Sequence, residues 1–145
     1  MEQAGPAVKG STIYVSLEPC AHESVRGPSC ADGLVAAKPA RVVAALTDPD
    51  PRTAGSGFDR LVAAGISVER DAMAVEAHAS LAGFISRITK GRPHVTLKLA
   101  TSLDGCIAMA DGRSRWITND AARAHAHVER ARCDAILIGA GTVRA

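Results

Sequence analysis

The sequence predicts an α/β fold with a mainly parallel sheet, because strand-like and helix-like segments alternate over the first 90 residues, joined by short loops. The expected strands are apolar runs at 12–17, 41–46 and 66–69, and the expected helices, with apolar residues at helical spacing, are 29–37, 57–64 and 72–88. The run Asp48-Pro49-Asp50-Pro51 ends the second strand, since proline removes a hydrogen-bond donor and fixes φ.

Composition sets limits on the class of protein. The 145 residues are 47% hydrophobic and 22% charged, which is typical of one globular domain or two small ones. A net charge of +2 does not favour nucleic acid or a membrane surface as a partner. With four dispersed cysteines and neither a signal peptide nor a transmembrane run, a cytoplasmic setting without disulfides is expected.

A domain boundary is predicted at the run Thr89-Lys90-Gly91-Arg92-Pro93, giving domains at 1–90 and 93–145. The second domain is expected to contain strands at 94–99 and 135–139, a turn at Asp104-Gly105 and a helix at 120–132. A domain of this size has not closed a core of its own, so we expect it to lean on the first domain or to be a fragment.

Two cysteines form the strongest chemical motif. Cys20 follows the first strand and Cys30 begins the first helix, so the two thiols are predicted to converge on one point. The dipole and free N–H groups of a helix start favour the thiolate, which predicts a lowered thiol pKa. Because thiolate binds zinc, the pattern predicts half of a zinc site.

The other ligands of such a site are open. Structural zinc takes four ligands and catalytic zinc three plus water, so Cys20 and Cys30 alone are insufficient. His22 is more plausible as a lining residue of a substrate pocket than as the third ligand. The alternative for both cysteines is burial as small apolar residues.

Other polar residues are interpreted structurally. Asp48 and Asp50, between prolines, favour turn formation over a pair of catalytic carboxylates. Cys106 and Cys133 are predicted to be core residues. No function is assigned to the remaining histidines, which are His78, His94, His125 and His127.

The cysteine motif resembles one enzyme family. The run Leu17-Glu18-Pro19-Cys20-Ala21-His22, followed by Arg26, Pro28 and Cys30, is similar to a loop of the bifunctional riboflavin-biosynthesis deaminase/reductases. In that family the loop reads approximately Glu-Pro-Cys-x-His-x-Gly-Arg-Thr-Pro-Pro-Cys. The loop between the two cysteines is one residue longer here.

Later segments resemble the same family in the same order, so the resemblance covers essentially the whole chain. They are the stretches 45–51 with Gly55-Ser56-Gly57, then 98–105, Ser114-Arg115-Trp116-Ile117-Thr118, and Gly139-Ala140-Gly141-Thr142-Val143. The resemblance implies an incomplete cytidine-deaminase-like three-layer α/β/α domain, followed by the start of a dihydrofolate-reductase-like α/β domain. It also implies zinc and NADPH as cofactors and a small pyrimidine nucleotide as substrate.

The chemistry implied is two successive steps of riboflavin synthesis. A zinc-activated water first replaces an amino group of a phosphoribosylamino-pyrimidine, and NADPH then reduces the ribose to a ribityl chain. The resemblance implies metal ligands Cys20 and Cys30, substrate contacts His22, Arg26, Ser114 and Arg130, and cofactor contacts Ala100, Trp116 and Thr142. Lys98 is a candidate to polarise the sugar. The alternatives are an exposed strand residue for Lys98, a solvated loop residue for Arg26 and a core anchor for Trp116.

One departure separates this chain from an active deaminase. The family carries a His-x-Glu motif upstream of the first strand, and none precedes residue 12 here. We therefore expect a form truncated at both ends that has little activity alone. Two alternatives are a non-catalytic fragment or pseudoenzyme that binds a nucleotide or partner, and a single-activity nucleobase deaminase relative. A homo-oligomer is compatible with either.

Overall fold

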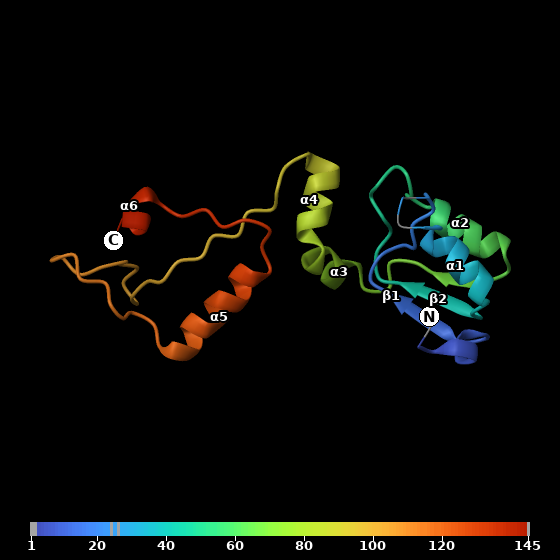
Figure 1. Cartoon of the computed structure of the whole chain (residues 1–145), viewed down its shortest axis with the longest axis horizontal. Coiled ribbons are helices and arrows are strands. Elements are labelled where there is room, and N and C mark those ends of the chain that lie inside the picture. The colour runs from blue at the N-terminus through green and yellow to red at the C-terminus, as the bar shows by residue number, and fades with distance from the viewer. Residues whose placement is uncertain (1–2, 24, 26, 145) are drawn as a thin grey trace. The chain divides into compact units, whose positions relative to one another are not determined.

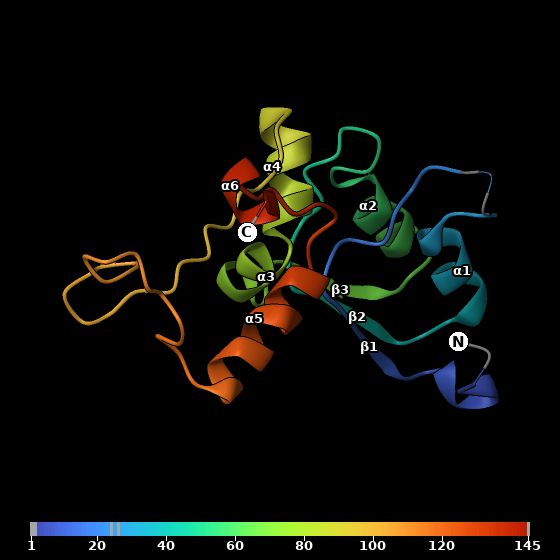
Figure 2. The same cartoon turned by 60° about the vertical axis from the view of Figure 1, so that its left-hand side comes forward.

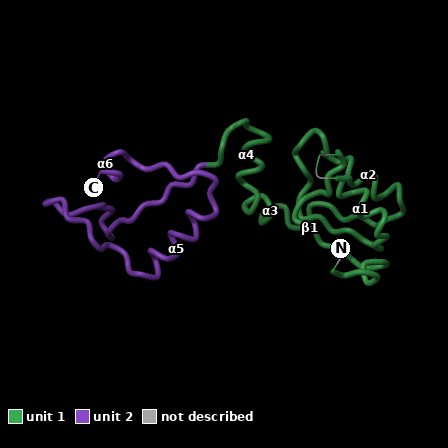
Figure 3. Tube along the Cα trace, in the orientation of Figure 1, with its two compact units in different colours: residues 1–94 green, residues 95–145 purple. Residues whose placement is uncertain are grey.

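The structure is a computed structural model that describes residues 3–23, 25 and 27–144. The chain divides into two compact units, Met1–His94 and Val95–Ala145 (Figure 3). None of the described helices combines the length and the apolar content needed to cross a membrane.

A three-stranded parallel sheet forms the centre of the first unit (Figure 1). Its strands stand in the order β1 (Thr12–Val15), β2 (Arg41–Ala44) and β3 (Ser67–Glu69). The register aligns Ile13, Val42 and Val68 across the sheet, so these side chains share one face. The predicted α/β fold with a parallel sheet is therefore confirmed.

Two helices pack against each other beside this sheet (Figure 2). Helix α1 (Cys30–Ala37) begins where the Ser29 side chain accepts a hydrogen bond from the Asp32 N–H at 3.1 Å. Helix α2 (Ser56–Ala63) follows Gly55, whose φ of 88° suits a residue without Cβ. Both helices were predicted, and each starts one residue away from the expected position.

The core of the first unit lies between α1, α2 and the sheet. Its buried members are Leu34, Val42, Leu61 and Ile66, packed by Ile13, Val15, Val35 and Val68. Tyr14, on the opposite face of the sheet, is 75% exposed. The described structure is thus an α/β fold, and the expected third layer stays a prediction.

The helix predicted at 72–88 is instead two helices. Helix α3 (Ala74–Ser80) and helix α4 (Ala82–Lys90) are separated at Leu81, whose φ and ψ are −102° and 15°. Gly83 in the first turn of α4 weakens the case for a continuous helix, because glycine is a poor helix former. The short 3₁₀ helix η1 (Gly5–Val8) was also not predicted.

The second unit contains fewer regular elements. Helix α5 (Asp120–Ala131) was predicted, and the Asn119 side chain caps it by accepting from the Ala122 N–H at 2.9 Å. A five-residue helix, α6 (Ala140–Arg144), follows the segment 135–139. The predicted turn is confirmed by a 2.9 Å hydrogen bond from the Gly105 N–H to the Ser102 carbonyl.

The strands predicted at 94–99 and 135–139 are wrong, since both segments are irregular. Within the described part of the second unit no segment pairs with them, and an unpaired strand leaves its backbone groups to water. Leu137, expected in a buried strand, is fully exposed. An apolar run predicts a strand only where a neighbouring strand exists.

Candidate functional site

The structure brings Cys20 and Cys30 together. Cys20 lies in the loop after β1, and Cys30 is the first residue of α1. The backbone N–H of Cys30 donates to Cys20 Sγ at 3.2 Å, and the Ala31 N–H donates to the Cys20 carbonyl at 3.1 Å. Cys20 is half-buried and Cys30 is exposed, so burial as an apolar residue does not describe Cys30.

The Cys20 side chain affects the ionisation of Cys30. The hydrogen bond with Cys20 raises the pKa of Cys30 above its ordinary value, and burial and the Cys20 charge act in the same direction. The lowering expected from the helix start is therefore wrong for Cys30, because the hydrogen bond with Cys20, burial and the Cys20 charge outweigh the opposing backbone hydrogen bond. A bound cation would instead favour ionisation, since it stabilises both thiolates.

The cysteine pair has the donor chemistry of a zinc site. Within the described ranges, no group of three or more His, Cys, Asp or Glu side chains is placed to hold a metal ion. The His22 ring places Nδ1 3.2 Å from the Thr53 hydroxyl oxygen, and Thr53 is fully buried. Cys20 and Cys30 therefore fit zinc as two of its ligands and require further donors to complete the set.

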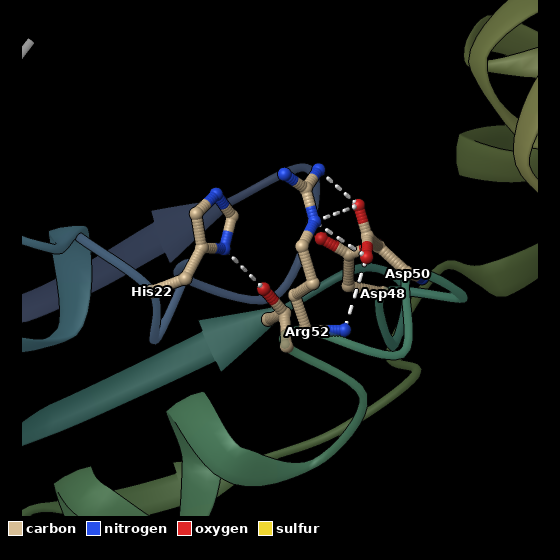
Figure 4. Close-up of polar contacts among 5 residues, drawn as sticks. His22, Asp48, Asp50 and Arg52 are labelled. Carbon is tan, nitrogen blue, oxygen red and sulfur yellow. Dashed lines mark hydrogen bonds and ion pairs between the residues drawn. The ribbon is translucent and has the colours of Figure 1, made fainter. Parts of the chain in front are cut away.

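His22 faces a loop of nested turns after β2 (Figure 4). The Asp50 N–H donates to Asp48 Oδ1 at 2.8 Å, and the Arg52 N–H donates to Asp50 Oδ1 at 3.0 Å. The Arg52 side chain also donates from Nε to the same oxygen at 3.0 Å. The turn-forming role predicted for both aspartates is confirmed, although both are also buried.

The two aspartates of this loop have opposite pKa shifts. Burial raises the pKa of Asp48, and the charges of Asp50 and Glu18 add to the rise, while the hydrogen bond from the Asp50 N–H opposes it. Hydrogen bonds from the Arg52 side chain and backbone lower the pKa of Asp50 to about 2. Asp50 is therefore the firmly ionised member of the pair.

Sequence reasoning missed Glu18, to which it assigned no role. The residue is only 3% exposed, and its carboxylate accepts four backbone hydrogen bonds. Asp48 and Gly55 donate to Oε2 at 3.2 and 3.0 Å, and Gly57 and Phe58 donate to Oε1 at 2.9 and 3.3 Å. The available signal was a charged residue placed between an apolar strand and Pro-Cys.

The start of α1 is tied to α2 by Arg60. Its NH1 donates to Asp32 Oδ1 at 2.9 Å and to the Ser29 hydroxyl oxygen at 3.1 Å. The hydrogen bond from the Ser29 hydroxyl lowers the pKa of Asp32 most. Arg60 lowers it further, while burial acts in the opposite direction. Arg26, the predicted substrate contact of the preceding loop, lies outside the described residues.

The positions predicted for NADPH and its substrate lie in the second unit. Ala100 is half-buried, whereas the others are exposed: Lys98, Ser114, Trp116, Arg130 and Thr142. Trp116 is 71% exposed, so the core-anchor alternative is wrong, and the Arg123 guanidinium lies 4.3 Å from its ring centre. In the described structure, no hydrogen bond or ion pair joins any two of these six predicted residues.

The segment directly after Ala100 lines an open depression. Its lining residues are Thr101, Ser102, Leu103, Asp104 and Ile117. Cys106 and Cys133 are exposed, so the prediction that they are core residues is wrong. The second unit has too few buried residues to enclose them, Ala126 being the one buried hydrophobic among its described residues.

Comparison with known proteins identifies relatives of the whole chain. The family model for the RibD C-terminal domain matches residues 93–145. Riboflavin biosynthesis protein RibD of Escherichia coli K12 is 48% identical over 145 residues, which are 100% of this chain and 39% of that protein. RibD of Haemophilus influenzae Rd is 46% identical over 99% of this chain and 38% of that protein.

Solved structures agree with the sequence relatives. A diaminohydroxyphosphoribosylaminopyrimidine deaminase/5-amino-6-(5-phosphoribosylamino)uracil reductase from Thermotoga maritima is similar with a TM-score of 0.87 and 38% identity, covering 98% of this chain and 40% of that one. Acinetobacter baumannii RibD, form 1, has a TM-score of 0.76 and 46% identity, covering 90% of this chain and 36% of that one. The chain spans about two fifths of the length of these relatives. Residues 93–145 thus match the RibD C-terminal domain, and the whole chain is similar to part of the RibD riboflavin-biosynthesis proteins.

Proposed function

We propose that this chain takes part in riboflavin biosynthesis, the process for which its relatives are named. The observation that carries the proposal is the convergence of Cys20 and Cys30 in a chain 48% identical to a RibD over its whole length. We assign 1–90 to the C-terminal part of a zinc-dependent deaminase domain with a cytidine-deaminase-like fold. We assign 93–145 to the N-terminal part of an NADPH-dependent reductase domain with a dihydrofolate-reductase-like fold, which the match to the RibD C-terminal domain supports.

The proposed substrate is a phosphoribosylamino-pyrimidine. In the first step water replaces a ring amine and ammonia leaves, with no change of oxidation state. In the second step NADPH delivers a hydride to the ribose, which takes up a proton and opens to a ribityl chain. The name of the Thermotoga maritima protein, which contains both a deaminase and a reductase, supports the pairing of these steps.

In the deaminase domain, Cys20 and Cys30 would hold zinc through their thiolates. Bound zinc supplies the Lewis acidity that activates water for the hydrolysis. We propose that His22 lines the substrate pocket, and its hydrogen bond with Thr53 supports this role because it fixes the orientation of the ring. Arg26 is the proposed partner of a phosphate or ribose oxygen.

Metal content tests the deaminase part of the proposal. We expect about one zinc per purified wild-type chain by elemental analysis, lost in both Cys20→Ser and Cys30→Ser. The matched controls are Cys106→Ser and Cys133→Ser, which alter exposed cysteines far along the chain and should keep the metal. Zinc that survives either of the first two substitutions would contradict the assignment of the ligands.

In the reductase domain, we propose cofactor contacts at Ala100, Trp116 and Thr142. Lys98, Ser114 and Arg130 are the proposed substrate contacts. Trp116 is the single tryptophan of the chain, so its fluorescence reports directly on this site. We expect NADPH to quench that fluorescence in a saturable manner, and a linear, non-saturating response would count against the assignment.

We further propose that these 145 residues have little deaminase activity alone. No His-x-Glu precedes Cys20, and the loss of a general acid/base typically costs about 10²–10⁴-fold in rate. A second candidate, a non-catalytic fragment or pseudoenzyme that binds a nucleotide or partner, gains support because no third metal-ligating side chain of the described residues joins the cysteine pair. The match of 93–145 to a RibD domain disfavours a single-activity deaminase. Measurable release of ammonia from the pyrimidine nucleotide by the zinc-loaded chain favours the first candidate over the second.

A further inference from the structure

Glu18 links the loop that carries Cys20 to helix α2. We propose that Glu18 is a positioning residue for the Cys20–Cys30 metal site, acting through the backbone rather than as a ligand. The inference rests on the proposed function, since it concerns the geometry of the metal site assigned there. It is carried by the burial of Glu18 and by the four N–H groups that its carboxylate accepts.

The four donors come from two elements that follow β2. Asp48 and Gly55 belong to the loop, whereas Gly57 and Phe58 belong to the first turn of α2. The first N–H groups of a helix have no partner within the helix, so the Glu18 carboxylate serves as a cap supplied from a distant part of the chain. One side chain thereby fixes the position of the strand exit relative to both elements.

Backbone contacts also hold the loop that contains Glu18 and Pro19 in place. The Glu18 N–H donates to the Leu46 carbonyl at 2.9 Å, which joins the exits of β1 and β2. A Cβ built on Gly57 would lie 2.0 Å from the Pro19 carbonyl oxygen, so only glycine lets α2 approach this point. Because Cys20 follows Pro19 directly in the chain, the position of Pro19 also limits the position of Cys20.

Helix α2 also holds the other cysteine. Arg60 binds Ser29 and Asp32, the cap and first turn of α1, and Cys30 lies between them in sequence. Glu18 and Arg60 thus attach the two thiol-bearing segments to the same helix. The distance between the thiols depends on both attachments, so weakening the Glu18 attachment frees Cys20 relative to Cys30.

Substitutions of Glu18 separate positioning from folding. Glu18→Gln keeps the size of the side chain but replaces one carboxylate oxygen with an NH₂ donor, which leaves two N–H groups facing a donor. Glu18→Ala removes all four bonds. Glu18→Asp keeps the charge on a shorter stem and should restore part of the wild-type behaviour. The control is Glu76→Gln, an exposed residue of α3.

The first measurement is titration with Cd²⁺, followed by the thiolate-to-cadmium absorption band, with far-UV circular dichroism to verify the fold. We expect the wild-type chain to develop the band and Cys20→Ser to lose it. Glu18→Gln should weaken the apparent affinity by about 10- to 100-fold, the usual effect of removing a group that orients a ligand. Glu76→Gln should match the wild type.

The second measurement needs no metal. Diamide accepts two electrons from Cys20 and Cys30: one thiolate adds to it, and the other displaces the reduced diamide to form the disulfide. We expect peptide mass spectrometry to show slower disulfide formation in Glu18→Gln than in wild type. Alkylation of Cys106 should be equally fast in both, because that exposed residue lies outside the held loop.

The outcomes distinguish the inference from the proposed function. A wild-type chain without a cadmium band overturns the proposed metal site, while the disulfide rates still test the positioning by Glu18. A folded Glu18→Gln or Glu18→Ala variant with wild-type affinity and a wild-type disulfide rate overturns the positioning role. Should Glu18→Ala unfold, Glu18→Gln decides the question alone.

Discussion

The two units of the chain differ in what they bury. In the first unit, even polar groups that are costly to bury, such as the Glu18 carboxylate and the Thr53 hydroxyl, are buried and have hydrogen-bond partners. In the second unit, large apolar side chains such as Leu103, Leu137 and Val95 are exposed. Both units carry apolar runs of strand length, but only the first pairs them. An apolar run needs a neighbouring strand before it can build a core.

Amide hydrogen exchange should show the largest difference between the units. The central strand β2 pairs on both sides, whereas 94–99 donates no backbone hydrogen bond to the described residues. We expect amides of β2 to exchange about three orders of magnitude or more slowly than those of 94–99, since opening β2 requires disrupting the core. Similar protection in both segments would show that the second unit forms a sheet in solution.

Substitution of one leucine in each unit tests the same difference in burial. Leu61 is fully buried in the core of the first unit, and Leu137 of the second unit is fully exposed. Leu61→Ala should lower the free energy of unfolding by about 2–5 kcal/mol, because it removes buried methyl groups and leaves a cavity. Leu137→Ala should change it by less than about 0.5 kcal/mol. Urea unfolding followed by circular dichroism measures both, and equal effects would contradict the burial difference.

The strands of the first unit and helices α1 and α2 could be predicted because each has a local signal. The apolar run at 41–46, the Ser29 cap and the Asp-Pro run mark a strand, a helix start and a strand end. The break at Leu81 could not be predicted from periodicity, because the apolar spacing continues through it, and Gly83 was the available local signal. Periodicity indicates which side of a helix is apolar and carries no information on whether the helix is continuous.

In the candidate site, contacts between residues far apart in the sequence could likewise not be predicted. The Cys20–Cys30 pair could be predicted from a strand exit and a helix start ten residues apart. The bonds of Glu18 could not, since its partner Phe58 is 40 residues away in the sequence. A buried carboxylate that caps a distant helix leaves no periodic pattern. The direction of the Cys30 pKa was also missed, because it depends on a neighbour in space.

Gly57 offers a test within the first unit. Gly57→Ala places a methyl group against the Pro19 carbonyl, a backbone atom that cannot move aside without shifting the loop. We expect a loss of about 1–3 kcal/mol in the free energy of unfolding, which is typical of overpacking. The matched control is Gly83→Ala in α4, where nothing lies within 4 Å.

Gly83→Ala should be neutral or stabilise by up to about 1 kcal/mol, because alanine favours the helix and restricts the unfolded chain. The two variants insert the same methyl group and differ only in its surroundings. Unfolding curves in urea that shift in the same direction for both would contradict the close approach of α2 to Pro19.

The smallest effects are expected from the acid dependence of the loop after β2. The folded pKa of Asp50, at about 2, lies below its ordinary value, so its contribution to stability is present above about pH 4 and is lost as pH falls toward 2. Asp50→Asn should therefore lower the melting temperature at pH 7 and flatten its decline below pH 4. Asp134→Asn, at an exposed position of the second unit, is the control.

Asp48 should behave in the opposite way. Its folded pKa is raised, so protonation favours the folded state, and the charge becomes a cost as pH rises through the ordinary value to the raised one. Asp48→Asn keeps an oxygen that can accept the Asp50 N–H and removes that cost, so we expect a higher melting temperature at pH 7. Melting curves between pH 2 and 8 measure the effect. A lower melting temperature at pH 7 would mean that the Asp48 charge is needed, and that the carboxylate has a cationic partner in solution.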